Sequence, residues 1–90
     1  MAEIFIRPRA TDGFKSAGKE EQQKIKAAIE VLRNGKLPAH TKKLSGTTSG
    51  YRIRVGKWRI LFVLWRGEID IVDIFIKKAK MITKNYSIIK

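Results

Sequence analysis

The chain contains no cysteine among its 90 residues, so neither a disulfide nor a zinc–thiolate site can contribute to it. Long hydrophobic runs are also missing. The longest, Ile60–Trp65 and Ile71–Ile76, fall well short of the roughly 18 apolar residues that span a membrane. Ile4–Ile6 is too short for the core of a signal peptide. We therefore expect a cytoplasmic protein with no membrane role.

Acidic residues are scarce. The sequence has 8 Asp and Glu against 20 Lys and Arg, a formal net charge of +12, and no acid lies between Glu30 and Glu68 or after Asp73. Hydrophobic residues make up 43% of the chain, which indicates a folded globule and not a disordered polycation. Protein surfaces usually mix both signs of charge, so this imbalance favours an anionic partner over simple solubilising charge. The acids are too scattered to predict a magnesium site, and we expect no cofactor.

Periodicity predicts two helices and a set of strands. Ile25, Ala28, Ile29 and Leu32 form the apolar stripe of the stronger helix. The strands after Gly50 follow one another closely, which favours an antiparallel meander. The expected elements are a strand over Ala2–Arg7, helices over Arg9–Ala17 and Lys19–Asn34, a linker over Lys36–Ser49, strands over Tyr51–Val55, Trp58–Trp65 and Glu68–Ile76, and a short helix or tail from Lys78.

The segment YRIRVGKWRILF, residues 51–62, reads as a β-hairpin. Gly56-Lys57 is a two-residue connection with glycine first, which is typical of a type II′ turn. The resulting register sets Val55 beside Trp58 and Arg54 beside Arg59. Alternation along each strand then predicts a core face and a cationic face. The core face contains Tyr51, Ile53, Val55, Trp58, Ile60 and Phe62, and the cationic face contains Arg52, Arg54 and Arg59.

Three arginines on one face repel one another, by about 1 kcal/mol or less per contact in water. Binding of a phosphate would turn this repulsion into attraction, since arginine offers a planar fork to phosphate oxygens. The alternative is a solvated face whose guanidiniums pair in part with Glu68, Asp70 or Asp73. The single histidine, His40, is expected to be a solvent-exposed loop residue, and Trp65 to lie in the core or on an apolar partner surface.

The sequence resembles the RelE/ParE superfamily of bacterial toxins from type II toxin–antitoxin pairs. The likeness runs through EIFIRP, VLRNGK, KKLSG, YRIRVGKWRILFVL and IDIVDIFIKKAK to the late Tyr86, and the FIKKAK tail is similar to the HigB-like branch. It implies one RelE-like domain over residues 1–90. It also implies an α+β fold, in which two N-terminal helices pack on a small, mainly antiparallel, twisted sheet.

The resemblance further implies an activity, which is cleavage of messenger RNA in the ribosomal A site by metal-independent attack of the substrate's own 2′-OH. The implied partners are an acidic cognate antitoxin and mRNA on the ribosome, with contacts to 16S rRNA. Two alternatives remain open at this point. One is a ParE-like toxin that inhibits DNA gyrase, and the other is a catalytically degenerate homologue that binds RNA without cutting it.

Matched position by position, the superfamily's functional residues fall on the basic face and the C-terminal tail. Arg54 and Arg59 suit stabilisation of charge at phosphorus, Lys78 a general base, and Tyr86 base stacking or proton exchange. RelE itself carries lysines at the positions of Arg52 and Arg54, and other members have a C-terminal histidine that this chain lacks. The implied catalytic residues are Arg54, Arg59, Lys78 and Tyr86, and the implied RNA-binding residues are Arg52, Lys42, Lys43, Lys57, Lys77 and Lys80.

Overall fold

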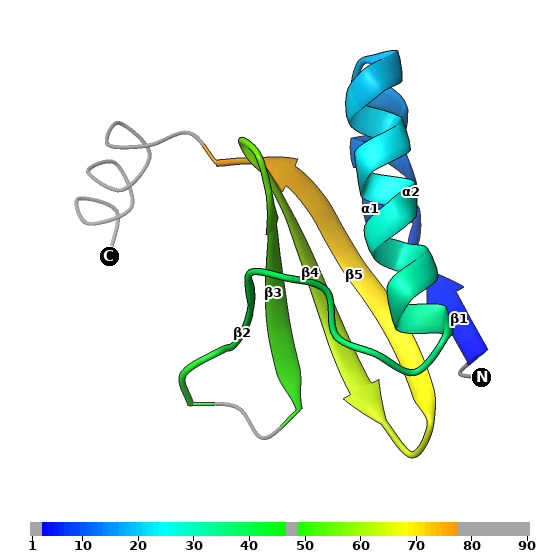
Figure 1. Ribbon diagram of the computed structural model, residues 1–90, viewed down its shortest axis with the longest axis vertical. Coiled ribbons are helices and arrows are strands. Elements are labelled where there is room, and N and C mark those ends of the chain that lie inside the picture. Colours follow the sequence, from blue (N-terminus) through cyan, green and yellow to red (C-terminus); the bar gives the residue numbers. More distant parts are fainter. Residues whose placement is uncertain (1–2, 47–48, 78–90) are drawn as a thin grey trace.

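A computed structural model describes residues 3–46 and 49–77 of the chain. Figure 1 shows two helices on one side of a sheet, an α+β arrangement. Neither described helix has the length and apolar character needed to cross a membrane. The elements in chain order are β1 (Glu3–Ile6), α1 (Pro8–Ser16), α2 (Lys19–Arg33), β2 (Thr41–Lys43), β3 (Gly50–Val55), β4 (Trp58–Trp65) and β5 (Glu68–Ile76).

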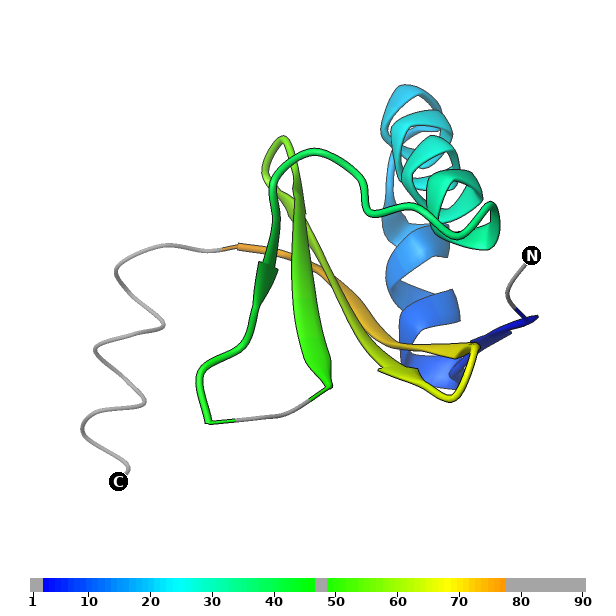
Figure 2. The ribbon, with the colours of Figure 1, turned by 60° about the horizontal axis from the view of Figure 1, so that its bottom comes forward.

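The five strands form one sheet in the order β1-β5-β4-β3-β2. The expected antiparallel meander of β3, β4 and β5 is confirmed, and β4 and β5 have the predicted bounds. β2 pairs antiparallel with β3, whereas β1 pairs parallel with β5, so the sheet is mixed but mainly antiparallel. In the turned view of Figure 2 both helices stay on the same side of the strands, which leaves the opposite face of the sheet uncovered by them.

The core lies between the helices and the sheet. The stripe of α2 is buried as predicted, and Ile53, Ile60 and Phe62 of the hairpin are at most 1% exposed. Tyr51 and Phe62 stack with ring centroids 5.3 Å apart. Burying one such large apolar side chain contributes about 1.5–3 kcal/mol, so this face fixes the register of the hairpin.

The first helix starts earlier than its pattern predicts and approaches the sheet closely. The helix is expected to begin at Arg9, but Pro8 is the first residue of α1, where its missing N–H costs nothing. Gly13 lies against β5, and a Cβ there would be 1.8 Å from the carbonyl oxygen of Ile74. Glycine therefore serves a close helix–sheet contact at a position where sequence alone shows only a weakened helix.

The stretch Lys36–Ser49 is not the plain linker that the sequence predicts, because it contains β2. Lys42 pairs with Arg52 of β3, and the Arg54 N–H donates to the His40 carbonyl oxygen at 3.2 Å. The Thr41 hydroxyl donates to the carbonyl oxygen of Pro38 at 2.6 Å, which fixes the entry to the strand. Three polar residues form a strand here because β3 supplies the partner, and a non-local partner leaves no mark on the local sequence.

Candidate active site

The β3–β4 hairpin has the predicted register and orients its arginines as predicted. Val55 pairs with Trp58, Arg54 with Arg59 and Ile53 with Ile60. Gly56 has φ +59, the left-handed value that the first position of a type II′ turn requires. Since Ile53, Trp58 and Ile60 point into the core, the arginines of the alternate positions project from the opposite face.

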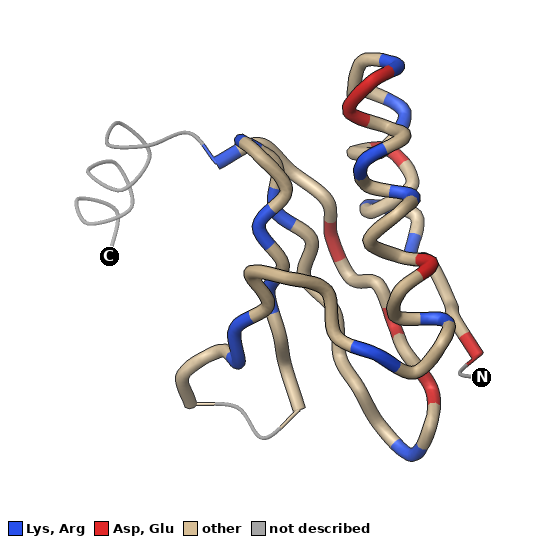
Figure 3. Tube along the Cα trace, viewed as in Figure 1, with Lys and Arg blue, Asp and Glu red and all other residues tan. Residues whose placement is uncertain are grey.

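A pocket of about 380 Å³ opens on this cationic face. In Figure 3 the basic positions of β2, β3 and β4 gather away from the acidic positions of β5 and the helices. We call this feature the cationic pocket. Its lining residues are His40, Lys42, Arg52, Arg54, Arg59 and Lys77.

The arginines of the cationic pocket have no carboxylate partner within the described part of the chain. Of the three acids proposed as alternative partners, Asp70 pairs with Arg7 and Asp73 pairs with Arg9 at 3.2 Å. The third, Glu68, lies beside Trp65, at the other end of β4 from the Gly56 turn. The pKa of Arg59 is lowered, first by burial and then by the charges of Arg52 and Arg54. The pocket is therefore a concentration of uncompensated positive charge.

Arg59 is the most firmly held of the three arginines. Its guanidinium donates to the carbonyl oxygens of Gly56 and Trp58, both at 2.9 Å. These bonds anchor one edge of the fork to the hairpin turn. The remaining N–H groups of the guanidinium are free to contact a ligand, since arginine has five donors. Fixed donors of this kind stabilise developing negative charge without reorganisation during the reaction.

His40 lines the cationic pocket, which the sequence did not indicate. It is exposed, as predicted, but its backbone takes a left-handed conformation with φ 64. The Arg54 Nη2 lies 3.4 Å from the His40 Nδ1, in addition to the backbone bond between these residues. The prediction of a solvent-exposed loop residue is confirmed, but the position of His40 at the pocket was not predicted. The pairing of β2 with β3, which brings His40 to Arg54, could not be read from the linker.

The other implied RNA-binding residues divide between the pocket and the rest of the surface. Lys42 and Lys77 line it. Lys43 pairs with Tyr51 and follows Lys42 on the strand, so it faces the other side of the sheet. Lys57 lies at the hairpin turn, with its Nζ 3.8 Å from a carboxylate oxygen of Glu21. Three further predicted site residues lie outside the described part of the chain, namely Lys78, Lys80 and Tyr86.

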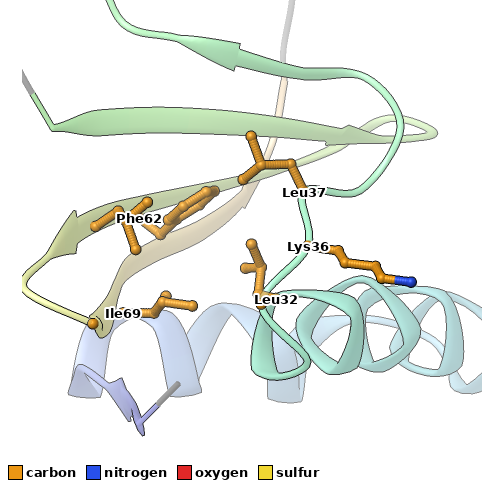
Figure 4. Close-up of a pocket in the computed structure, with 8 residues that line it drawn as sticks. Leu32, Lys36, Leu37, Phe62 and Ile69 are labelled. Carbon is orange, nitrogen blue, oxygen red and sulfur yellow. The ribbon is translucent and has the colours of Figure 1, made fainter. Parts of the chain in front are cut away.

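A second pocket, of about 310 Å³, has a different character. Figure 4 shows Leu32, Leu37, Phe62 and Ile69 converging on it, while the ammonium of Lys36 points away. It lies beside the end of α2, on the helix side of the sheet. Its apolar lining offers no group for acid–base or charge-stabilising chemistry, so the cationic pocket is the candidate active site. Within residues 3–46 and 49–77, no group of three or more His, Asp or Glu side chains is close enough to hold a metal ion.

The exposed Trp65 resolves one sequence alternative. It is 58% exposed, so it is not a core residue, whereas Trp58 is buried at 3%. The guanidinium carbon of Arg66 lies 5.4 Å from the Trp65 ring centroid. Trp65 is therefore an accessible aromatic side chain at the far end of β4 from the Gly56 turn.

The chain is similar to known proteins in sequence and in fold. No family model matches the chain. A protein of Methanocaldococcus jannaschii named "Putative toxin RelE1" is 32% identical over 73 residues, which cover 77% of this chain and 81% of that protein.

The fold is similar to that of solved RelE proteins. The toxin chain of the RelB–RelE antitoxin–toxin complex from Methanococcus jannaschii superposes with a TM-score of 0.73 at 20% identity, covering 96% of this chain and 99% of the other. The RelE–RelB complex from Pyrococcus horikoshii gives 0.75 at 19% identity, over 88% and 98% of the two chains. Together with the sequence identity over most of both chains, these similarities show that the chain belongs to the RelE family of toxins from toxin–antitoxin systems.

Proposed function

We propose that this RelE-family toxin is an endoribonuclease that cleaves mRNA in the ribosomal A site and so inhibits translation. The observation that carries the proposal is the cationic pocket, where Arg52, Arg54 and Arg59 converge without an acidic partner among the described residues. An uncompensated arginine cluster is costly unless a ligand neutralises it. An RNA phosphate is a suitable complement, because two of its oxygens can bind the planar fork of a guanidinium at once.

The chemistry uses the substrate's own 2′-OH as nucleophile and the cations of the pocket to stabilise charge. The ribose 2′-OH next to the scissile phosphate attacks phosphorus, and the 5′-oxygen leaves. During this attack the phosphoryl oxygens gain negative charge. Arg59, held by the turn carbonyls, and Arg54 on the neighbouring strand are placed to donate hydrogen bonds to those oxygens. Arg52, Lys42 and Lys77 would contact the flanking phosphates. Lys43, Lys57 and Lys80 stay proposed as RNA contacts, and Lys78 and Tyr86 as catalytic residues.

The decisive experiment incubates the purified chain with translating ribosomes and maps the cut sites on the mRNA. Wild-type protein is expected to cut, and Arg59→Ala to cut about 10²–10³-fold more slowly, the usual cost of losing one charge-stabilising donor. Arg33→Ala is the matched control, because Arg33 is an exposed arginine on α2, outside the cationic pocket. Full activity of Arg59→Ala would remove Arg59 from the mechanism. Salt-sensitive RNA binding without any scission would make the chain a degenerate homologue.

The proposed partner is an acidic antitoxin that covers the basic surface. The net charge of +12 favours such a partner, and solved relatives were determined as complexes of RelE with RelB. Binding there would compete with RNA for the same arginines. Co-expression with the product of an adjacent gene tests this idea: a cognate antitoxin relieves growth arrest, whereas persistent arrest with every small acidic neighbour contradicts it.

A further inference from the structure

The proposed cleavage requires a group that removes a proton from the 2′-OH. Within the described residues, the cationic pocket is lined by five lysines and arginines and by His40. Arginine stays protonated in proteins, and an ordinary lysine is protonated at neutral pH. Histidine side chains, in contrast, ordinarily exchange their proton between about pH 5 and 8. Among the described lining residues, His40 is therefore the side chain best suited to accept a proton.

The contacts of His40 indicate which nitrogen could act. The Arg54 Nη2 lies 3.4 Å from Nδ1, and because a guanidinium can only donate, it can hydrogen-bond to the imidazole only in the tautomer whose proton sits on Nε2. In that tautomer Nδ1 carries the lone pair. The backbone N–H of Arg54 also donates a hydrogen bond to the carbonyl oxygen of His40, at 3.2 Å. One arginine thus positions both the backbone and the basic nitrogen of the histidine.

We propose that His40 is the general base of this site, an inference that rests on the endoribonuclease function proposed above. Nδ1 takes the proton of the 2′-OH, the 2′-oxygen bonds to phosphorus, and the bond from phosphorus to the 5′-oxygen breaks. The products are a 2′,3′-cyclic phosphate and a 5′-hydroxyl, whose proton comes from water or from the ammonium of a lining lysine such as Lys77. His40 later returns its proton to solvent.

Arg54 links substrate binding to release of the base. Its 3.4 Å contact with Nδ1 is long for a hydrogen bond to nitrogen, and the Arg54 side chain is exposed. An incoming phosphate offers the guanidinium a charged acceptor, which forms a stronger bond than a neutral imidazole does. Arg54 then turns to the phosphate through its other N–H groups and leaves Nδ1 open to the 2′-OH.

The residues that line the pocket together with His40 are all cations within the described part of the chain: Lys42 on β2, Arg52 and Arg54 on β3, Arg59 on β4, and Lys77 after β5. The proton taken up by His40 adds a further positive charge beside the phosphorus. It arrives at the step in which the phosphoryl oxygens gain negative charge. The imidazolium is disfavoured by the neighbouring cations and favoured by the phosphoryl oxygens, so proton uptake by His40 depends on the bound phosphate.

Because the backbone of His40 is left-handed, two substitutions can remove the imidazole without changing the backbone conformation. Asparagine and glycine both accept a positive φ, so His40→Asn and His40→Gly keep the φ of 64 without added strain. Asparagine also retains an oxygen that can accept from Arg54, yet it cannot take a proton. Arg66→Asn is the matched control, because Arg66 has φ 50 and lies in the β4–β5 turn, outside the cationic pocket.

The test measures single-turnover cleavage of ribosome-bound mRNA against pH, with binding of an RNA that carries a 2′-O-methyl group at the cut site. We expect His40→Asn to cut about 10²–10⁴-fold more slowly, the typical contribution of a general base. RNA binding should be unchanged, and the rise of the wild-type rate with pH should be lost. Added imidazole should restore part of the activity of His40→Gly. Arg66→Asn should match wild type in every assay.

The results distinguish failure of the His40 assignment from failure of the endoribonuclease function. If His40→Asn cuts at the wild-type rate with the wild-type pH profile, the base lies elsewhere and the RNase function stands. If His40→Asn loses RNA binding together with cleavage, and imidazole restores nothing to His40→Gly, His40 only positions Arg54. If the wild-type protein cuts no RNA, the endoribonuclease function and the assignment of the base fail together.

Discussion

At the residue scale, the neighbours of a side chain decide its role more than its type does. Gly13 would be a defect in an isolated helix, but here its missing side chain lets α1 approach the carbonyl oxygen of Ile74. Arg54 and Arg7 are both exposed arginines. Arg7 is neutralised by Asp70, whereas Arg54 faces a histidine and other arginines. Only Arg54 is therefore available for an external anion.

Replacing Gly13 with alanine should destabilise the protein. Alanine normally stabilises a helix by about 0.5–1 kcal/mol relative to glycine. The new Cβ would meet the Ile74 carbonyl oxygen at 1.8 Å, and backbone cannot move aside as a flexible side chain can. Overpacking of this kind costs about 1–3 kcal/mol, so the clash decides the sign. Urea unfolding measures the change, with exposed Gln23→Ala as the neutral control. A more stable Gly13→Ala would mean that α1 lies further from β5.

At the scale of elements, β1 is one of the two edge strands of the sheet and is held by a few specific contacts. The Arg7 N–H, just after the strand, donates to the Ile71 carbonyl oxygen at 3.0 Å. The Arg7 Nε donates to both carboxylate oxygens of Asp70, at 2.8 and 3.0 Å. The pKa of Asp70 is lowered, chiefly by its hydrogen bonds with Arg7. This ion pair therefore fastens the edge strand to β5.

The Arg7–Asp70 pair predicts a specific pH dependence of stability. A carboxyl whose pKa is lower in the folded chain stabilises the fold at pH values above its unfolded pKa, and that contribution is lost as the pH falls through the folded value. Asp70→Asn should therefore lower Tm at neutral pH. The difference from wild type should close as the pH falls below the ordinary pKa of 3.8. Thermal unfolding at several pH values measures this difference.

Asp12→Asn serves as the control for the pH experiment. Asp12 is an exposed acid on α1 without an ion pair among the described residues. The Tm of the Asp12→Asn variant should follow that of wild type at each pH. A constant difference between Asp70→Asn and wild type down to strongly acidic pH would show that the carboxylate charge does not stabilise the edge strand.

How far the sequence predicts this structure depends on where each partner lies. The hairpin register and the three arginines follow from Gly56 and from strict alternation, because strand neighbours in a hairpin are close in sequence. The bounds of β4 and β5 follow for the same reason. β2, the contact of Gly13 with Ile74 and the placement of His40 depend on partners distant in sequence. Nothing in the local pattern around those residues records such partners.

At the scale of the whole molecule, the sheet separates two environments. The helices cover one face and create the core (Figure 2), while residues of the hairpin and β2, together with Lys77, line the cationic pocket on the other. The strands that present the arginines are therefore fixed by apolar burial on their opposite side. Positive charge can accumulate on the open face because the core, and not the pairing of charges, determines the register.

This distribution of charge predicts the salt dependence of RNA binding. On single strands, each phosphate neutralised contributes about 0.7 to the slope of log affinity against log salt concentration. Arg52→Gln should therefore weaken binding of an uncleavable 2′-O-methyl RNA and reduce the slope by about 0.7. Fluorescence anisotropy across a salt series measures both effects. Arg66→Gln, outside the pocket, should leave the slope unchanged, and an equal loss in both variants would argue for diffuse attraction without a defined site.

The parallel pairing of β1 with β5 has a consequence for how the chain is made. The register sets Glu3 beside Glu68, so the first described strand to leave the ribosome must wait for the last one before it can pair. The β3–β4–β5 meander closes only short loops and can form as it emerges, whereas closing the long loop back to β1 costs more chain entropy. The arginine hairpin should therefore take shape before the N-terminal strand is locked in place, and a nascent toxin would present the proposed RNA-binding face before its fold is complete.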